Sequence, residues 1–186
     1  MKQSLLFTGH MIDAPGRAEP RFPPEKENMV RKAIWSALQK EKETATGNLT
    51  GIASGDCGAS ILFLECCIEL GIPAEIYLPL PIHEFRKTSV AFAGEDWNRR
   101  FDDLCEKLPL RMLPHGTGDQ SRSVWERANE WMLSIAMKNG RRNMSLLALW
   151  NGKKGDGAGG TEEMVRLAEQ QQVRIEIIDI NKLEGI

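Results

Sequence analysis

A glycine-rich stretch between an apolar run and an amphipathic run is the part of this sequence best suited to chemistry. It reads Trp-Asn-Gly-Lys-Lys-Gly-Asp-Gly-Ala-Gly-Gly-Thr from residue 150 to residue 161. Glycines let a backbone approach a ligand closely, and a helix that begins after them would direct free N–H groups at a phosphate. Lys153 and Lys154 could neutralise the negative charge of such a phosphate. The alternative is a long flexible connection that binds nothing.

A second turn of this kind separates an apolar run from a helical run. It contains Ser54, Gly55, Asp56 and Gly58. Asp56 could donate to or accept from a ribose hydroxyl, or it could cap the helix that follows. Both roles are compatible with a position at the end of a strand.

The first apolar run of the chain ends at Gly9 and His10. His10 could contact a ligand, act as a base or form a structural hydrogen bond. Residues 10–27 then lack periodicity and contain several prolines, and structureless stretches of this length are usually functional or disordered. If this stretch folds over a ligand, Arg17 and Arg21 could bind phosphate or carboxylate. Otherwise it is a solvated surface loop.

Carboxylates near these turns are the candidates for catalysis. Glu65 lies inside the apolar helical run 61–68, where a carboxylate must be paired, protonated or at the surface. Facing a cleft, Glu65 would suit general acid–base work; the alternative is a surface position shared with Glu69. Glu162 and Glu163 follow the glycine-rich stretch and are further candidates for an acid.

Large and polar side chains on the helices are interpreted as structural. Asn129 lies between Ala128 and Trp131 on an amphipathic helix, and we expect it at the surface. Trp150 ends a strand beside the glycine-rich stretch and could stack on a base. The other tryptophans at helical spacing are predicted to lie in the core: Trp35, Trp97, Trp125 and Trp131.

The elements that must position these turns alternate between strands and helices. Apolar runs predict strands at residues 4–8, 49–54, 74–78, 110–113, 143–150 and 173–180. Helical spacing predicts helices at residues 29–43, 59–70, 95–107, 123–138 and 161–172, and residues 82–94 are ambiguous. This alternation predicts an α/β fold: a single Rossmann-like domain over residues 1–186, with a mainly parallel sheet of about six strands and helices on both faces. The turns that follow strands would then meet at one edge of the sheet, where such sheets bind ligands.

Composition narrows the class of protein. The net charge of −2 argues against nucleic-acid binding by bulk electrostatics. No apolar run is long enough for a signal peptide or a membrane span. The four cysteines form no Cys-x-x-Cys motif and the three histidines are scattered, so no metal site is expected. Reduced cysteines and no export signal predict a cytoplasmic protein. A homo-oligomer is also possible from the sequence, since related folds often pair through helices.

The sequence resembles the SLOG superfamily of Rossmann-like domains. That group includes the "lonely guy" phosphoribohydrolases and DNA-processing protein A, and it is related to nucleoside deoxyribosyltransferases. The chain is also similar to a poorly characterised bacterial domain found beside tetratricopeptide repeats. The resemblance covers the whole alternation and rests on Thr8-Gly9-His10, Gly51-Ile52-Ala53-Ser54-Gly55-Asp56 and Gly157-Ala158-Gly159-Gly160-Thr161. It implies that glycine loops at strand ends hold a nucleotide or a nucleotide-derived signal. Some members cleave or transfer an N-glycosidic bond, and others only sense.

The chain departs from the phosphoribohydrolase pattern Gly-Gly-x-Gly-Thr-x-x-Glu. Aligned at Thr161, the second glycine falls on Ala158 and the glutamate falls on Met164. Methionine can be neither acid, base nor nucleophile, and moving one or two positions along a helix turns a side chain by about 100–200°. Glu162 or Glu163 would therefore point elsewhere.

We therefore expect a sensor or binding module for a small nucleotide-type ligand, with no required cofactor. The alternatives are an N-glycosidic-bond hydrolase or transferase, with Glu65, Glu162, Glu163 or Asp56 as the acid, and an interaction module without ligand. The phosphate contacts would be Gly157, Gly159, Gly160 and Thr161. The remaining ligand contacts would be Gly9, His10, Ser54, Gly55, Asp56 and Gly58.

Overall fold

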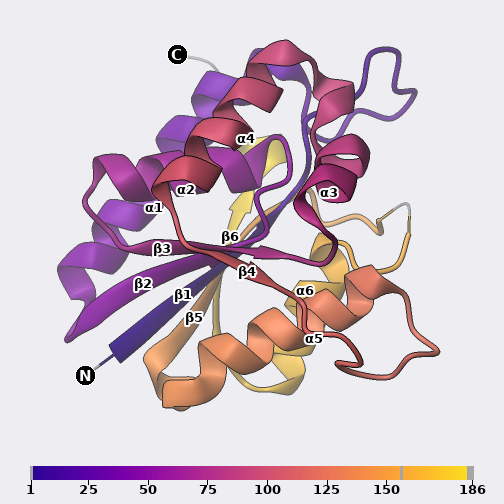
Figure 1. Cartoon of the computed structure of the whole chain (residues 1–186). Coiled ribbons are helices and arrows are strands. Elements are labelled where there is room, and N and C mark those ends of the chain that lie inside the picture. The colour runs from indigo at the N-terminus through magenta and orange to yellow at the C-terminus, as the bar shows by residue number, and fades with distance from the viewer. Residues whose placement is uncertain (1, 156, 184–186) are drawn as a thin grey trace.

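The computed structural model describes residues 2–155 and 157–183 of the chain, and its strands form one six-stranded sheet (Figure 1). Neighbouring strands are parallel and lie in the order β4-β3-β2-β1-β5-β6. The strands are β1 (Lys2–Gly9), β2 (Asn48–Ala53), β3 (Ala74–Leu78), β4 (Leu110–Met112), β5 (Met144–Trp150) and β6 (Arg174–Asp179). The predicted Rossmann-like α/β fold is confirmed.

Helices cover both faces of this sheet, with α1, α2 and α4 on one side and α5 and α6 on the other (Figure 1). The helices are α1 (Glu27–Thr44), α2 (Ala59–Glu69), α3 (Ile82–Ser89), α4 (Glu95–Lys107), α5 (Val124–Ala136) and α6 (Thr161–Gln170). Short 3-10 helices occupy Pro24–Lys26, Ala91–Ala93, Met137–Asn139, Arg141–Asn143 and Ile180–Lys182. The ambiguous residues 82–94 thus form α3 and a 3-10 turn. Within the described residues, no helix has the length and apolarity to cross a membrane.

The central strand β1 is buried on both faces. Its side chains alternate, as the pleat requires: Leu5 and Phe7 contact the core beneath α1 and α2, and Leu6 contacts the core beneath α5 and α6. Phe7 stacks on Phe63 of α2, with ring centroids 4.5 Å apart. This packing fixes where β1 ends, and therefore where the residues that follow it emerge.

The order of the strands reverses at β1. The chain builds outward from β1 through β2, β3 and β4, then returns to add β5 on the other side of β1. Gly9 at the end of β1 is in register with Leu149 near the end of β5. In open parallel sheets, such a reversal opens a crevice at the carboxyl ends of the strands. The fold therefore places a crevice between the loops that follow β1 and β5.

The proline-containing stretch after β1 is anchored to the body of the protein. Ile12 and Phe22 are buried. The Asp13 carboxylate accepts the backbone N–H groups of Arg21 and Phe22 at 2.9 and 3.0 Å, which closes residues 13–22 into a compact loop. The stretch is therefore a surface loop, as one of the two alternatives predicts, and its buried side chains Ile12 and Phe22 hold it to the body of the protein.

Gly58 allows this stretch to pack against the start of α2. Its φ of 102° favours glycine, and Met11 forms an antiparallel bridge with it. A Cβ atom at Gly58 would lie 2.4 Å from the backbone nitrogen of Ile12. Gly58 is thus required by a close approach of two backbone segments.

We predict that Gly58→Ala destabilises the protein far more than Gly71→Ala. Both glycines have a positive φ, but no atom lies within 4 Å of a Cβ built at Gly71. Gly71→Ala should cost about 1–2 kcal/mol of backbone strain. Gly58→Ala should cost about 3 kcal/mol or more, because overpacking adds to the strain. Urea unfolding measures both, and equal losses would contradict the close approach.

Candidate functional site

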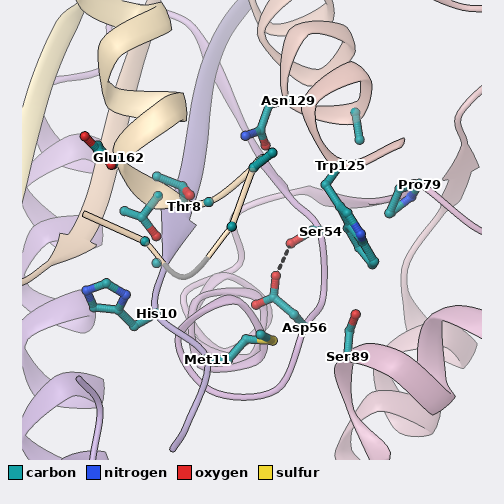
Figure 2. A pocket seen from close by; sticks show the side chains of 18 of the residues that line it. Thr8, His10, Met11, Ser54, Asp56, Pro79, Ser89, Trp125, Asn129 and Glu162 are labelled. Carbon is teal, nitrogen blue, oxygen red and sulfur yellow. Dashed lines mark hydrogen bonds between the residues drawn. The ribbon is translucent and has the colours of Figure 1, made fainter. Parts of the chain in front are cut away.

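A cavity of about 310 Å³ lies at the carboxyl edge of the sheet, where the strand order reverses. It is lined by the ends of β1, β2 and β5, by α3 and α5, and by the glycine-rich loop with the start of α6 (Figure 2). Most of the predicted ligand contacts line it: Gly9, His10, Ser54, Asp56, Gly157, Gly159, Gly160 and Thr161. Gly55 and Gly58 do not line it. A Cβ atom at Gly55 would meet the core side chains Ile76 and Phe101, and one at Gly58 would meet the backbone of Ile12.

Asp56 and Ser54 form a hydrogen-bonded pair in the cavity wall (Figure 2). The Ser54 hydroxyl donates to Asp56 Oδ2 at 2.6 Å. Asp56 Oδ1 is buried and has no hydrogen-bond partner among the described residues. Burial raises the pKa of Asp56, since desolvation disfavours the carboxylate. The N-cap of α2 is Gly58, without a side-chain cap, so the capping interpretation of Asp56 is wrong.

Asn129 also lies in the cavity wall, and its interpretation as a surface residue is wrong. Only 6% of the residue is exposed, and its Nδ2 atom is buried without a partner in the described part of the chain. A buried donor left unpaired costs about 1–3 kcal/mol. The cavity-lining residues of α5 are Trp125, Ala128, Asn129 and Met132, one helical face at spacings i, i+3, i+4 and i+7. This spacing, which is visible in the sequence, could have placed Asn129 on the same face as Trp125 and Met132. Trp125, predicted to lie in the core, also lines the cavity in the structure.

The glycine-rich loop packs directly on the first turn of α5. A Cβ atom at Gly159 would lie 2.3 Å from Trp125 Cβ, and the φ of Gly159 is +81°. A Cβ at Gly157 would meet nothing within 4 Å, and one at Gly160 would meet only a loop carbonyl 3.8 Å away. Gly159 therefore serves the packing of the loop, whereas Gly157 and Gly160 present open backbone beside the cavity.

Glu163 holds this loop in place and does not line the cavity. Its Oε2 accepts the backbone N–H of Gly159 at 2.6 Å, and its Oε1 accepts Arg122 Nη2 at 2.7 Å. Glu162 does line the cavity. Met164, at the position of the glutamate in the phosphoribohydrolase pattern, is fully buried in the core beneath α6. That position faces away from any ligand in this chain.

Glu65 also lies outside the cavity. Arg100 donates to both of its oxygens, from Nε at 2.8 Å and from Nη2 at 2.7 Å. Arg100 donates to Glu27 as well, and it lies over the Trp97 ring at 4.0 Å from the centroid. Glu65 is thus a paired structural carboxylate on the far side of α2, and the interpretation that it faces a cleft is wrong.

Of the four basic residues predicted as phosphate contacts, two line the cavity and two do not. Arg21 and Lys153 line the cavity, whereas Arg17 and Lys154 do not. Arg21 Nη2 donates to the backbone carbonyl of Lys154 at 3.4 Å, so the loop after β1 contacts the glycine-rich loop directly. Trp150 lines the cavity too, and its indole N–H donates to the Lys153 carbonyl at 2.9 Å.

His10 fixes the turn after β5. Its Nε2 accepts the backbone N–H of Asn151 at 3.2 Å, and burial lowers the pKa of the ring. A ring nitrogen that accepts an N–H carries no proton, so this hydrogen bond places the ring proton on Nδ1. Since the Nε2 lone pair is engaged, the structural alternative for His10 is the one that the geometry supports.

The thiols are poorly suited to act as nucleophiles, and the described residues form no cluster suited to a metal ion. Burial raises the pKa of Cys66 to about 12 and that of Cys105 to about 11, and it raises the pKa values of Cys57 and Cys67 as well. Over residues 2–155 and 157–183, no group of three or more His, Cys, Asp or Glu side chains could hold a metal ion.

Comparison with known proteins gives one distant similarity. No family model and no curated protein matches the sequence. Among solved structures, the chain is similar to DNA processing protein A from Streptococcus pneumoniae, with a TM-score of 0.36 and 12% identity. The similarity covers 99% of this chain and 62% of that one, so the chain spans less than two thirds of its length. Similarity at this level carries no functional inference.

We predict that Asp56→Asn stabilises the protein at neutral pH. The folded-state pKa of Asp56 is raised, so between the unfolded and folded pKa values the folded state binds more protons. Wild-type stability therefore falls as the pH rises through that window. The advantage of Asp56→Asn should grow from about pH 4 and level off above the folded pKa. Urea unfolding across the acid-to-neutral range measures it, and a pH-independent difference would count against the buried carboxyl.

We predict opposite tolerance at two neighbouring glycines. Gly159→Ala should cost about 2–4 kcal/mol, since the added Cβ collides with Trp125 at a positive φ. Gly157→Ala should change the free energy of unfolding by less than about 0.5 kcal/mol. Thermal and urea unfolding compare the two variants. A large loss in Gly157→Ala would mean that the loop is packed there as well.

Proposed function

We propose that the cavity binds a nucleotide or a nucleotide-derived ligand, and that the protein acts as a sensor or binding module. The proposal rests on one coincidence: a helix N-terminus flanked by open glycine backbone and an unpaired buried carboxyl oxygen line the same cavity. The helix N-terminus suits an anion, and the carboxyl oxygen of Asp56 suits a hydroxyl group that donates to it. A phosphorylated sugar carries both groups at a fixed spacing.

The phosphate is assigned to the start of α6. The first backbone N–H groups of a helix lack partners within it and carry the positive end of the dipole. Gly157 and Gly160 leave the approach to Thr161 open, and the cationic side chains of Lys153 and Arg21 line the same cavity. Together these groups would supply directional donors and balancing charge.

The sugar is assigned to Ser54 and Asp56 at the end of β2. Asp56 Oδ1 has no protein partner among the described residues, so a ribose hydroxyl that donates to it would remove the cost of its burial. The Ser54 hydroxyl holds the carboxyl in one orientation. Glu65 and Glu163 have no part in this assignment, since both are engaged outside the cavity.

A second candidate function is cleavage or transfer of an N-glycosidic bond. It is favoured by Asp56 itself, which is a carboxyl group with a raised pKa in the wall of a cavity. Such a group could protonate a leaving base or attack the sugar. Binding is preferred because the pattern's glutamate is replaced by the buried Met164.

One incubation separates the two candidates. The protein at near-stoichiometric concentration is mixed with nucleoside mono-, di- and triphosphates, NAD, and cyclic and ADP-ribose derivatives, then ultrafiltered. A nucleotide that is depleted from the filtrate and recovered intact on denaturation identifies a binder. A free base or ribose phosphate in the filtrate identifies an N-glycosidase. If no compound is retained or changed, both candidates are wrong and an interaction module remains.

We predict that Lys153→Met weakens binding of the retained nucleotide about tenfold, the usual loss for one charge-assisted contact. Lys154→Met is the matched control, since it removes the same charge from the neighbouring residue, which does not line the cavity. Calorimetric titration of both variants tests the phosphate assignment. Equal losses in the two variants would indicate a general charge effect and would contradict it.

A further inference from the structure

We propose that Asn129 recognises the base of the ligand, so that the cavity selects a nucleobase with a hydrogen-bond donor next to an acceptor on one edge. This inference rests on the proposed function and specifies the ligand class. It starts from the single polar residue on the face that α5 presents to the cavity. No catalytic step is required of Asn129.

Asn129 is buried, and the donor atom of its amide has no protein partner among the described residues. The residue is 6% exposed, and its Nδ2 atom has no hydrogen-bond partner within the described residues. The buried side chains of Ser145 and His10 have protein partners, since Ser145 donates to Glu41 and His10 accepts from Asn151. Asp56 Oδ1, in the same cavity wall as Asn129, has none among the described residues. Buried amides are normally satisfied, so an unsatisfied one in a cavity wall indicates a group that is supplied from outside.

The neighbours of Asn129 define the shape of that group. Trp125, Ala128 and Met132 line the cavity on the same face of α5, and they form an apolar and partly aromatic surface around the amide. Such a surface suits a flat aromatic ring, which can pack against the side chains and present its polar edge to the amide. A bare phosphate or sugar would leave this surface without apolar contact.

The chemistry of the amide narrows the group further. A carboxamide offers an N–H donor beside a carbonyl acceptor, and it pairs with a base edge that carries the complementary acceptor and donor. A phosphate carries acceptors only and would leave the carbonyl unused. The face also adjoins the proposed phosphate position, because Gly159 packs on Trp125 at the start of α5. One ligand could therefore reach both.

The test compares nucleotides with the same molecule lacking a base. Wild type and Asn129→Leu are titrated calorimetrically with AMP, GMP, CMP, UMP and ribose 5-phosphate. We expect wild type to bind at least one nucleotide more tightly than ribose 5-phosphate. Asn129→Leu should reduce that preference by about 10- to 100-fold, the loss of one or two hydrogen bonds, and leave ribose 5-phosphate within about threefold.

Two further variants keep the test decisive. Leu133→Met changes a buried residue of α5 that does not line the cavity, and it should retain the preference. Asn129→Asp keeps the shape but replaces the donor by an acceptor, so it should change which base is preferred. It also serves if Asn129→Leu does not fold.

The outcomes separate this inference from the proposed function. If Asn129→Leu and Asn129→Asp keep the wild-type base preference, Asn129 does not recognise the base and the inference is wrong. Wild type that binds ribose 5-phosphate as tightly as every nucleotide would overturn the inference but leave the phosphate site standing. Wild type that binds none of the five compounds would overturn the inference. The proposed function falls with it only if the protein also neither retains nor changes any compound of the wider nucleotide panel.

Discussion

The approach of the glycine-rich loop to α5 is the contact on which the site depends. Gly159 lies against Trp125 at a distance that no side chain would permit. Glu163 of α6 accepts a hydrogen bond from the backbone N–H of Gly159. Arg122, which precedes α5, donates to the other oxygen of Glu163. Because the loop is fixed at this point, the start of α6 and the cavity-lining face of α5 border one cavity. Without the contact they would belong to two separate surfaces.

The carboxylates of the chain divide between structural and cavity positions. Glu65 and Glu163 accept hydrogen bonds from arginine side chains or backbone N–H groups at both oxygens. Asp56 has the opposite environment, since one of its oxygens is unpaired and its burial disfavours the charge. Groups of the first kind maintain the shape of the fold, whereas a group of the second kind lowers the stability of the ligand-free protein.

Periodicity was sufficient to predict the fold, since buried parallel strands and amphipathic helices leave strong local signals. It also placed Asp56 and Thr161 at the carboxyl edge of the sheet. It could not show which glycines serve packing and which are open to a ligand, because both roles favour the same residue type. Only the structure shows that Gly159 packs on Trp125, whereas Gly157 and Gly160 do not. It missed Asn129 because a helix can have two buried faces, one toward the sheet and one toward a cavity. The partner of Glu65 was equally inaccessible, since Arg100 is distant in the sequence.

The strand order has a kinetic consequence. β1 pairs with β2 across one crossover through α1, as the register of Lys2 with Asn48 illustrates. It pairs with β5 only after the chain has also passed through β4, α4 and α5, as the register of Ser4 with Met144 illustrates. Loop closure over such a separation costs the most chain entropy and slows folding. The β1–β5 junction is therefore expected to form late, and the cavity forms with it. A nascent chain that has emerged only as far as β4 carries Ser54 and Asp56 but neither α5 nor α6. The cavity is therefore complete only once the β1–β5 junction has formed, and the proposed ligand would stabilise the finished sheet rather than an early intermediate.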